Sequence, residues 1–319
     1  MPNVVKHRLN RELTLILWHT VQRLDAILPR PARFLIATAL GEMAFWLLPG
    51  KRLAVLANMR RVLGPDAPAQ EVRQTAQRSF RNYAKYLSEF SHLPRWREED
   101  LETLMGSVSG WGHVEAALSA GKGAIFVTPH FGNWDLAGWY FGKRHSFSAV
   151  ADPLEPPELD ALVQGWRRVK HIGIIPVPNA ARGVMRALHA GGVVALVADR
   201  PTHARGEGAN VRFFGAWTQV PAGAAHFALK TGAPVIVCGV WRTPSNAYAG
   251  FVLPPLDFVK SDDRHRDVDD AMQRVMERLE TVIRAHPDQW YMFRPMWPLR
   301  SHVAAETGLT SAPQAPASA

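Results

Sequence analysis

The stretch Gly123-Ala-Ile-Phe-Val-Thr-Pro-His130-Phe-Gly-Asn-Trp-Asp135-Leu-Ala-Gly-Trp-Tyr-Phe141 indicates which fold to expect. Its first part is a short apolar run rich in branched residues, which is typical of a buried strand in a parallel sheet. The proline that follows ends this strand, because proline has no N–H for a central sheet ladder. A Gly-Asn pair then predicts a tight turn, and the apolar residues after it predict a helix. His130 is therefore expected just beyond the carboxyl end of a strand, where open α/β sheets bind their ligands.

The spacing of His130 and Asp135 predicts acid–base chemistry. A histidine that deprotonates a hydroxyl group works best when an acceptor holds its second ring nitrogen, because this sets the tautomer and stabilises the imidazolium. We expect Asp135 to be that acceptor, as the acid is in a Ser-His-Asp triad, and Asp135 to lie in the first helical turn. We also expect backbone N–H groups near Gly132 and Asn133 to stabilise an oxyanion. The alternative is a buried histidine at a strand end and an aspartate that only caps a helix.

Strand and helix patterns alternate along the rest of the chain, which predicts an α/β fold with a central, mainly parallel sheet flanked by helices. A second buried strand, 193–198, ends at Asp199 and Arg200 and so repeats the order of an apolar run followed by polar groups. Further strands are expected at 146–151, 173–177 and 234–240, and helices at 71–90, 114–119, 158–170, 181–190, 221–230 and 268–285.

The first 65 residues are predicted to be mostly helical and to associate with a membrane. An amphipathic segment is followed by a proline-containing break and by a more apolar helix over 32–48. This helix contains Arg33 and Glu42 and falls short of the roughly 20 predominantly apolar residues of a spanning helix. We therefore expect an amphipathic and apolar hairpin that lies at the interface. A helical pair packed on the protein body would show a similar pattern.

Composition limits the possible partners. The 319 residues carry a formal net charge of +9, which favours an anionic partner such as a membrane surface, a nucleic acid, an acidic carrier protein or a phosphorylated substrate. No helix-turn-helix, zinc-finger or RNA-binding pattern occurs, so we expect no nucleic acid partner. The single cysteine, Cys238, excludes an internal disulfide and a multi-cysteine zinc site. We expect neither a metal nor a redox cofactor.

His130-Phe-Gly-Asn-Trp-Asp135 resembles the His-x4-Asp/Glu box of the lysophospholipid acyltransferase superfamily, in the branch of the lipid A late acyltransferases and the phosphatidylinositol mannoside acyltransferase. Asp199-Arg200, the Phe-Phe-Gly turn at Phe214 and the ending 286–297 resemble later landmarks in the same order. The resemblance implies an O-acyltransferase that moves a fatty acyl group from acyl-carrier protein or acyl-coenzyme A to a hydroxyl of a membrane glycolipid or lysolipid. It also implies a peripheral or monotopic location on the cytoplasmic face of the inner membrane.

This resemblance assigns roles to individual residues. His130 is expected to be the general base, with Asp135 orienting it. Substrate binding is expected from Phe131, Gly132, Asn133, Asp152, Asp199, Arg200 and Phe214. Arg205 and Arg212 are further candidates for binding phosphate groups.

Other readings remain open from the sequence. The same site with water as the acceptor would make a thioesterase. A basic, non-enzymatic membrane-binding protein would also explain the charge, and a structural ion pair would also explain Asp199-Arg200. A mononuclear metal site at His113, His130 and Asp135 is conceivable, although the spacing matches no familiar zinc pattern. The predicted division is 1–65 membrane-associating helices, 66–300 catalytic domain and 301–319 disordered tail.

Overall fold

The computed structural model describes residues 2–202 and 208–297. The predicted tail 301–319 and the candidate Arg205 lie outside these residues. The described helices are α1 (Pro2–Ile27), α2 (Arg30–Leu47), α3 (Pro49–Leu63), α4 (Ala69–His92), α5 (Glu98–Leu104), α6 (Gly112–Ser119), α7 (Trp134–Gly142), α8 (Pro157–Val169), α9 (Ala180–His189), α10 (Gly223–Thr231) and α11 (Arg264–Ala285). The strands are β1 (Met105–Ser109), β2 (Ala124–Thr128), β3 (Phe147–Ala151), β4 (Gly173–Pro176), β5 (Val193–Val197), β6 (Gly208–Phe213), β7 (Ala216–Pro221), β8 (Val235–Arg242) and β9 (Tyr248–Val252).

Seven of these strands form one central sheet in the order β1-β9-β8-β2-β5-β3-β4. Every neighbouring pair is parallel except β8 and β9, which form an antiparallel hairpin. The predicted α/β fold with a mainly parallel sheet and flanking helices is therefore confirmed. Sequence patterns missed β1, β9 and the small antiparallel pair β6–β7, because short strands of this kind carry little periodicity.

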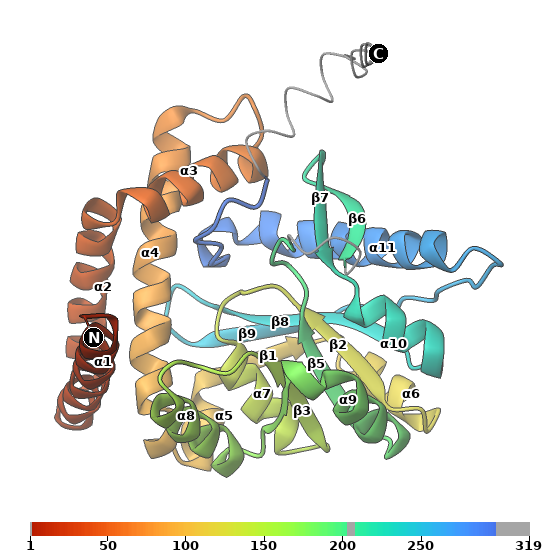
Figure 1. Cartoon of the computed structure of the whole chain (residues 1–319), viewed down its shortest axis with the longest axis horizontal. Helices are drawn as coiled ribbons and strands as arrows, with labels where there is room; N and C mark the ends of the chain where they lie inside the picture. The colour runs from red at the N-terminus through yellow and green to blue at the C-terminus, as the bar shows by residue number, and fades with distance from the viewer. Residues whose placement is uncertain (1, 203–207, 298–319) are drawn as a thin grey trace, which may run out of the picture.

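The sheet separates two hydrophobic clusters because successive side chains of a strand point to opposite faces. In β2, Ile125 and Val127 belong to the cluster shared with α9, α10 and α11, whereas Ala124 and Phe126 belong to the cluster shared with α5, α6, α7 and α8. Figure 1 shows α11 and α7 on opposite sides of the sheet. This two-sided burial explains why β2 reads as a continuous apolar run.

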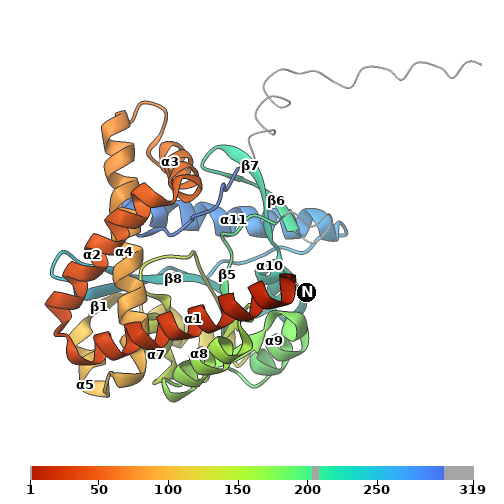
Figure 2. The same ribbon diagram turned by 60° about the vertical axis from the view of Figure 1, so that its left-hand side comes forward.

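The N-terminal helices cover one edge of this body, where α2 lies beside α4 (Figures 1 and 2). Phe45 of α2 and Val55 and Met59 of α3 reach into the main core. The opposite side of these helices carries most of the exposed large hydrophobic side chains, namely Ile16, Leu24, Ile27, Leu35, Ile36, Leu40, Met43, Trp46, Leu47, Leu48 and Leu53. We call this set the apolar face.

Among the described helices, none by itself is both long enough and apolar enough to cross a membrane. Only α2 and α3 taken together meet those criteria of length and composition, and they are bent by 95° at their junction. The hairpin predicted from the sequence therefore differs in detail, because α3 continues as a third helix after the apolar α2.

Candidate functional site

His130 lies just beyond the carboxyl end of β2, as the sequence predicted. Its Nδ1 lies 2.7 Å from Oδ1 of Asp199, and its backbone N–H donates to Oδ2 of the same carboxylate at 2.9 Å. Its side chain remains 15% exposed and lines a cavity. Because Asp199 engages Nδ1, the nitrogen left to act on a ligand is Nε2.

Asp199 reaches His130 because β2 and β5 are parallel neighbours in register. Thr128 pairs with Val197, so His130 and Asp199 each stand two residues beyond the same rung of the ladder. The Asp199 side chain is fully buried, and the Trp290 indole donates to its Oδ2 at 2.7 Å. Burial alone would raise the pKa of this carboxyl. The charge on His130 and the hydrogen bonds from His130 and Trp290 outweigh burial and hold the pKa below its ordinary value.

Asp135 has different partners, and the expectation that it holds the His130 ring is corrected here. It is buried in the first turn of α7, where it accepts from the Tyr86 hydroxyl at 2.8 Å and from Arg167 Nε at 2.8 Å. The helix directs this carboxylate toward α4 and α8, while the Nδ1 position of His130 is already filled by Asp199. Asp135 therefore joins α7 to its neighbours, and it also lines the cavity.

The turn between His130 and Asp135 is tightly built, and we call residues 130–135 the His130 turn. Gly132 adopts φ +57°, and a Cβ there would lie 1.8 Å from the Val240 carbonyl oxygen, so only glycine fits. The Gly132 N–H donates to the Gln289 carbonyl at 3.0 Å. The expectation that it would stabilise an oxyanion is therefore wrong for this amide, because it is already engaged.

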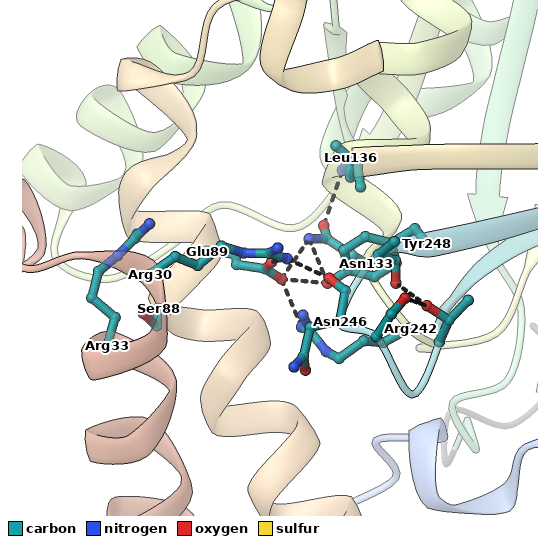
Figure 3. Close-up of polar contacts among 12 residues, drawn as sticks. Arg30, Arg33, Ser88, Glu89, Asn133, Leu136, Arg242, Asn246 and Tyr248 are labelled. Atoms are coloured by element: carbon teal, nitrogen blue, oxygen red, sulfur yellow. Dashed lines mark hydrogen bonds and ion pairs between the residues drawn. The ribbon is translucent and has the colours of Figure 1, made fainter. Parts of the chain in front are cut away.

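The Asn133 side chain is also occupied inside the protein. Its Oδ1 caps α7 by accepting from the Leu136 N–H at 3.0 Å, and its Nδ2 donates to the Tyr248 hydroxyl at 3.2 Å (Figure 3). The side chain is 1% exposed and does not line the cavity. Asn133 thus shapes the turn, and the structure gives no direct support to its predicted contact with substrate.

A cavity of about 740 Å³ opens beside His130. Its buried part is apolar and includes Phe126, Phe141 and Phe147, while its polar rim includes Asp152 and Arg200. These two rim residues form an ion pair at 3.7 Å, with side chains 66% and 45% exposed. A mostly apolar pocket with a few converging polar groups is the usual form of a small-molecule site.

The remaining candidates divide into two groups. Phe131 lines the cavity, as do His130, Asp135, Asp152 and Arg200. Phe214 does not line it and instead packs against Trp290, with ring centroids 6.1 Å apart. Arg212 also lies away from the cavity, and its Nη2 donates to the Gly215 carbonyl at 3.3 Å.

Neither metal nor thiol chemistry finds support in the described residues. No group of three or more His, Cys, Asp or Glu side chains there is placed to hold a metal ion, so His113, His130 and Asp135 do not form one. Cys238 lines the cavity but is 5% exposed, and burial raises the pKa of its thiol. A neutral, buried thiol is a poor nucleophile.

Three residues that complete the site have no predicted role from the sequence: Trp290, Arg167 and Tyr86. Each reaches an aspartate from a distant part of the chain, so no local spacing identifies it. The one usable sequence signal is the aromatic and polar ending 286–297, which resembles a family landmark but has no role assigned from the sequence.

Comparisons with known proteins identify similar chains. A family model described as "Bacterial lipid A biosynthesis acyltransferase" matches residues 5–298. The chain is 32% identical over 247 residues to "Phosphatidylinositol mannoside acyltransferase" of Mycobacterium tuberculosis (strain CDC 1551 / Oshkosh), which covers 75% of each protein. It is 25% identical over 179 residues to "Lipid A biosynthesis lauroyltransferase" of Escherichia coli (strain K12), which covers 56% of each. A crystal structure of the 1-acyl-sn-glycerophosphate acyltransferase from Thermotoga maritima aligns with a TM-score of 0.34 and 17% identity, over 79% of this chain and 99% of that one.

Proposed function

Since the chain belongs to the bacterial lipid A biosynthesis acyltransferase family and is an O-acyltransferase of lipid biosynthesis, we propose that it uses His130 as the general base to acylate a glycolipid hydroxyl. The observation that carries this proposal is the contact of His130 Nδ1 with Asp199 beside an apolar cavity. The acyl donor is a thioester of acyl-carrier protein or coenzyme A. No metal or redox cofactor takes part in the proposed reaction.

The reaction proceeds by direct attack of the acceptor on the thioester. His130 Nε2 takes the proton of the acceptor hydroxyl as its oxygen bonds to the thioester carbonyl carbon. Asp199 stabilises the imidazolium that forms, because its carboxylate stays ionised. When the tetrahedral intermediate collapses, the C–S bond breaks and His130 returns the proton to the departing sulfur. The products are an ester and a free thiol, and no acyl-enzyme forms.

The cavity suits a fatty acyl chain. Its buried part is apolar, and burying an alkyl chain there is favoured by roughly 0.8 kcal/mol for each CH₂ group. The reactive carbonyl lies at His130, between this apolar part and the polar rim. Arg200 is half exposed at that rim, where a guanidinium binds a phosphate of the donor or a polar group of the acceptor.

The apolar face supports a location at a membrane surface. Leu35, Leu40 and Leu47 project from α2 on the side away from the protein body, and Lys51 and Arg52 follow at the start of α3. An interfacial helix buries such an apolar side among the lipids, and neighbouring basic residues attract anionic headgroups. We place the protein on the cytoplasmic face of the inner membrane as a peripheral or monotopic enzyme, with its acceptor in that membrane.

The deciding experiment measures thioester consumption by the purified protein in detergent. Acyl-coenzyme A and acyl-carrier protein are compared, each with and without a phosphatidylinositol mannoside fraction or a lipid A precursor fraction. Wild type should convert a glycolipid to a product heavier by one acyl group, and His130→Ala should not. Release of free fatty acid alone would indicate a thioesterase. Equal activity in wild type and His130→Ala would remove His130 from the mechanism.

A further inference from the structure

A buried carboxylate on α4 lies outside the cavity and is not used by the mechanism. Glu89 has a fully buried side chain, and Arg242 Nη2 donates to its Oε2 at 2.6 Å (Figure 3). Arg30 Nη2 donates to its Oε1 at 2.7 Å, and the Tyr248 hydroxyl donates to Oε2. We call Glu89 and these three partners the Glu89 centre.

The Glu89 centre reaches the His130 turn by two routes. The first runs through Asn133, whose Nδ2 lies 3.2 Å from the Tyr248 hydroxyl and 3.4 Å from Glu89 Oε2. The second runs through the backbone of Arg242, which exchanges hydrogen bonds of 2.7 Å with both ends of the Gln289 side-chain amide. The Gln289 carbonyl in turn accepts from the Gly132 N–H. Gly132 and Asn133, in the middle of the His130 turn, are thus both connected by hydrogen bonds to the Glu89 centre.

Charge makes this arrangement rigid. A carboxylate without access to water is costly unless it is paired and hydrogen-bonded. Burial raises the pKa of Glu89, but the charges of Arg242 and Arg30 and the bonds from Arg242 and Tyr248 outweigh it and lower the pKa. Glu89 therefore stays ionised, and its oxygens are directed toward fixed donors rather than toward solvent.

The same centre is attached to the N-terminal helices. Arg30 begins α2, and its side chain is 30% exposed, in contrast to the buried Arg242. Arg30 Nη2 also donates to the Asn246 carbonyl at 2.5 Å, in the loop between β8 and β9. The helix that Arg30 begins carries much of the apolar face. A shift of α2 would consequently move Arg30, one of the two cations paired with Glu89, relative to that carboxylate.

We infer that Glu89 is a positioning residue that holds the His130 turn in its reactive conformation, and that Arg30 makes this hold depend on the seating of α2. The inference rests on the proposed role of His130. It predicts that loss of Arg30 acts on catalysis from outside the cavity, through the orientation of His130 against Asp199.

The chain offers a matched control for Arg30. Arg81 of α4 and Glu42 of α2 form a second ion pair between the same two helices, at 2.6 Å, and neither residue belongs to the Glu89 centre. The two arginines are similarly exposed, at 40% for Arg81 and 30% for Arg30, whereas Glu42 is 31% exposed and Glu89 is fully buried. Arg30→Gln and Arg81→Gln therefore each remove one ion pair between α2 and α4. Only Arg30→Gln removes a partner of Glu89.

Two readouts are compared in the full-length protein. The first is steady-state transfer. The second is the proton NMR signal of the His130 Nδ1–H bonded to Asp199, which is assigned by its absence in His130→Ala. Arg30→Gln should lower kcat about tenfold, because a small misplacement of a catalytic group is costly, and should shift the NMR signal. The donor KM of Arg30→Gln should stay within about twofold of wild type. For Arg81→Gln, kcat and donor KM should both stay within about twofold of wild type, and the NMR signal should not move.

Glu89→Gln is the stronger variant, and it should lower kcat about a hundredfold and shift or remove the NMR signal. If Glu89→Gln does not fold, the comparison of Arg30→Gln with Arg81→Gln tests the inference. The inference is overturned if Arg30→Gln leaves the NMR signal unchanged, or if the two arginine variants reduce kcat equally. If wild type transfers no acyl group, the proposed function fails, and the NMR comparison still decides whether Glu89 and Arg30 orient His130.

Discussion

Two buried aspartates can be compared as partners of His130. Asp199 follows the carboxyl end of β5, beside the end of β2, and Asp135 lies in the first turn of α7. At the strand ends, Asp199 accepts from His130 and Trp290 and so belongs to the reacting group. On α7, Asp135 accepts from Tyr86 and Arg167 and so belongs to the packing of helices. The partner of the histidine is therefore determined by the adjacency of β2 and β5 in the sheet and not by nearness along the chain.

The largest expected effect tests the strand-end side of this comparison. Asp199→Asn should reduce kcat about 10³-fold, because a neutral amide neither stabilises the imidazolium nor enforces the tautomer that leaves Nε2 as the base. Steady-state transfer and circular dichroism of the same preparation check this expectation. If Asp135→Asn in the folded protein loses more kcat than Asp199→Asn, the two roles have been assigned the wrong way round.

Substitution of Asp135 on α7 should mainly lower the stability of the protein. Asp135→Asn leaves the largely buried Arg167 guanidinium, 14% exposed, without its carboxylate, which should lower the free energy of unfolding by about 3 kcal/mol. Urea denaturation measures this loss, and the activity of the fraction that remains folded should fall less than in Asp199→Asn. A variant as stable as wild type would contradict the structural role of the Asp135–Arg167 pair.

A smaller effect sharpens the comparison at the strand ends. Trp290→Phe keeps the ring in the core but removes the indole N–H that donates to Asp199. Loss of one hydrogen bond to a buried carboxylate costs about 1.5–3 kcal/mol, and part of this cost should appear as a roughly tenfold lower kcat. Trp297→Phe is a suitable control, because Trp297 belongs to the same aromatic cluster and has no described contact with Asp199. Equal losses in both variants would assign the effect to packing.

The smallest effect concerns pH. The pKa of Asp199 lies below its ordinary value of 3.8, mainly because interactions with His130 and Trp290 outweigh burial. A lowered pKa in the folded state gives stability that is fully present above 3.8 and is lost as the pH falls through the folded value. The difference in unfolding free energy between wild type and Asp199→Asn should thus narrow as the pH falls from about 5 through the folded pKa of Asp199. Urea titrations at several pH values measure it, and a difference that grows on acidification would contradict this sign.

Several features were readable from the sequence for clear physical reasons. The two-sided burial of β2 and β5 appeared as continuous apolar runs, and Pro129 and Asp199 marked where those strands end. The polar groups that follow both strands are also visible in the sequence. The sequence does not show that the two strand ends lie side by side, because strand order depends on contacts between distant segments.

The sequence by itself determined the α/β class, the position of His130 at a strand end and the apolar character of the N-terminal helices, because periodicity and turn chemistry are local. The tertiary structure decided that Asp199 rather than Asp135 holds His130, and that Gly132 and Asn133 are bonded inside the protein. It also brought Trp290 to Asp199 and Glu89 to Asn133. These outcomes rest on strand neighbours and buried ion pairs between residues far apart in the chain, and such contacts leave no fixed spacing in a sequence.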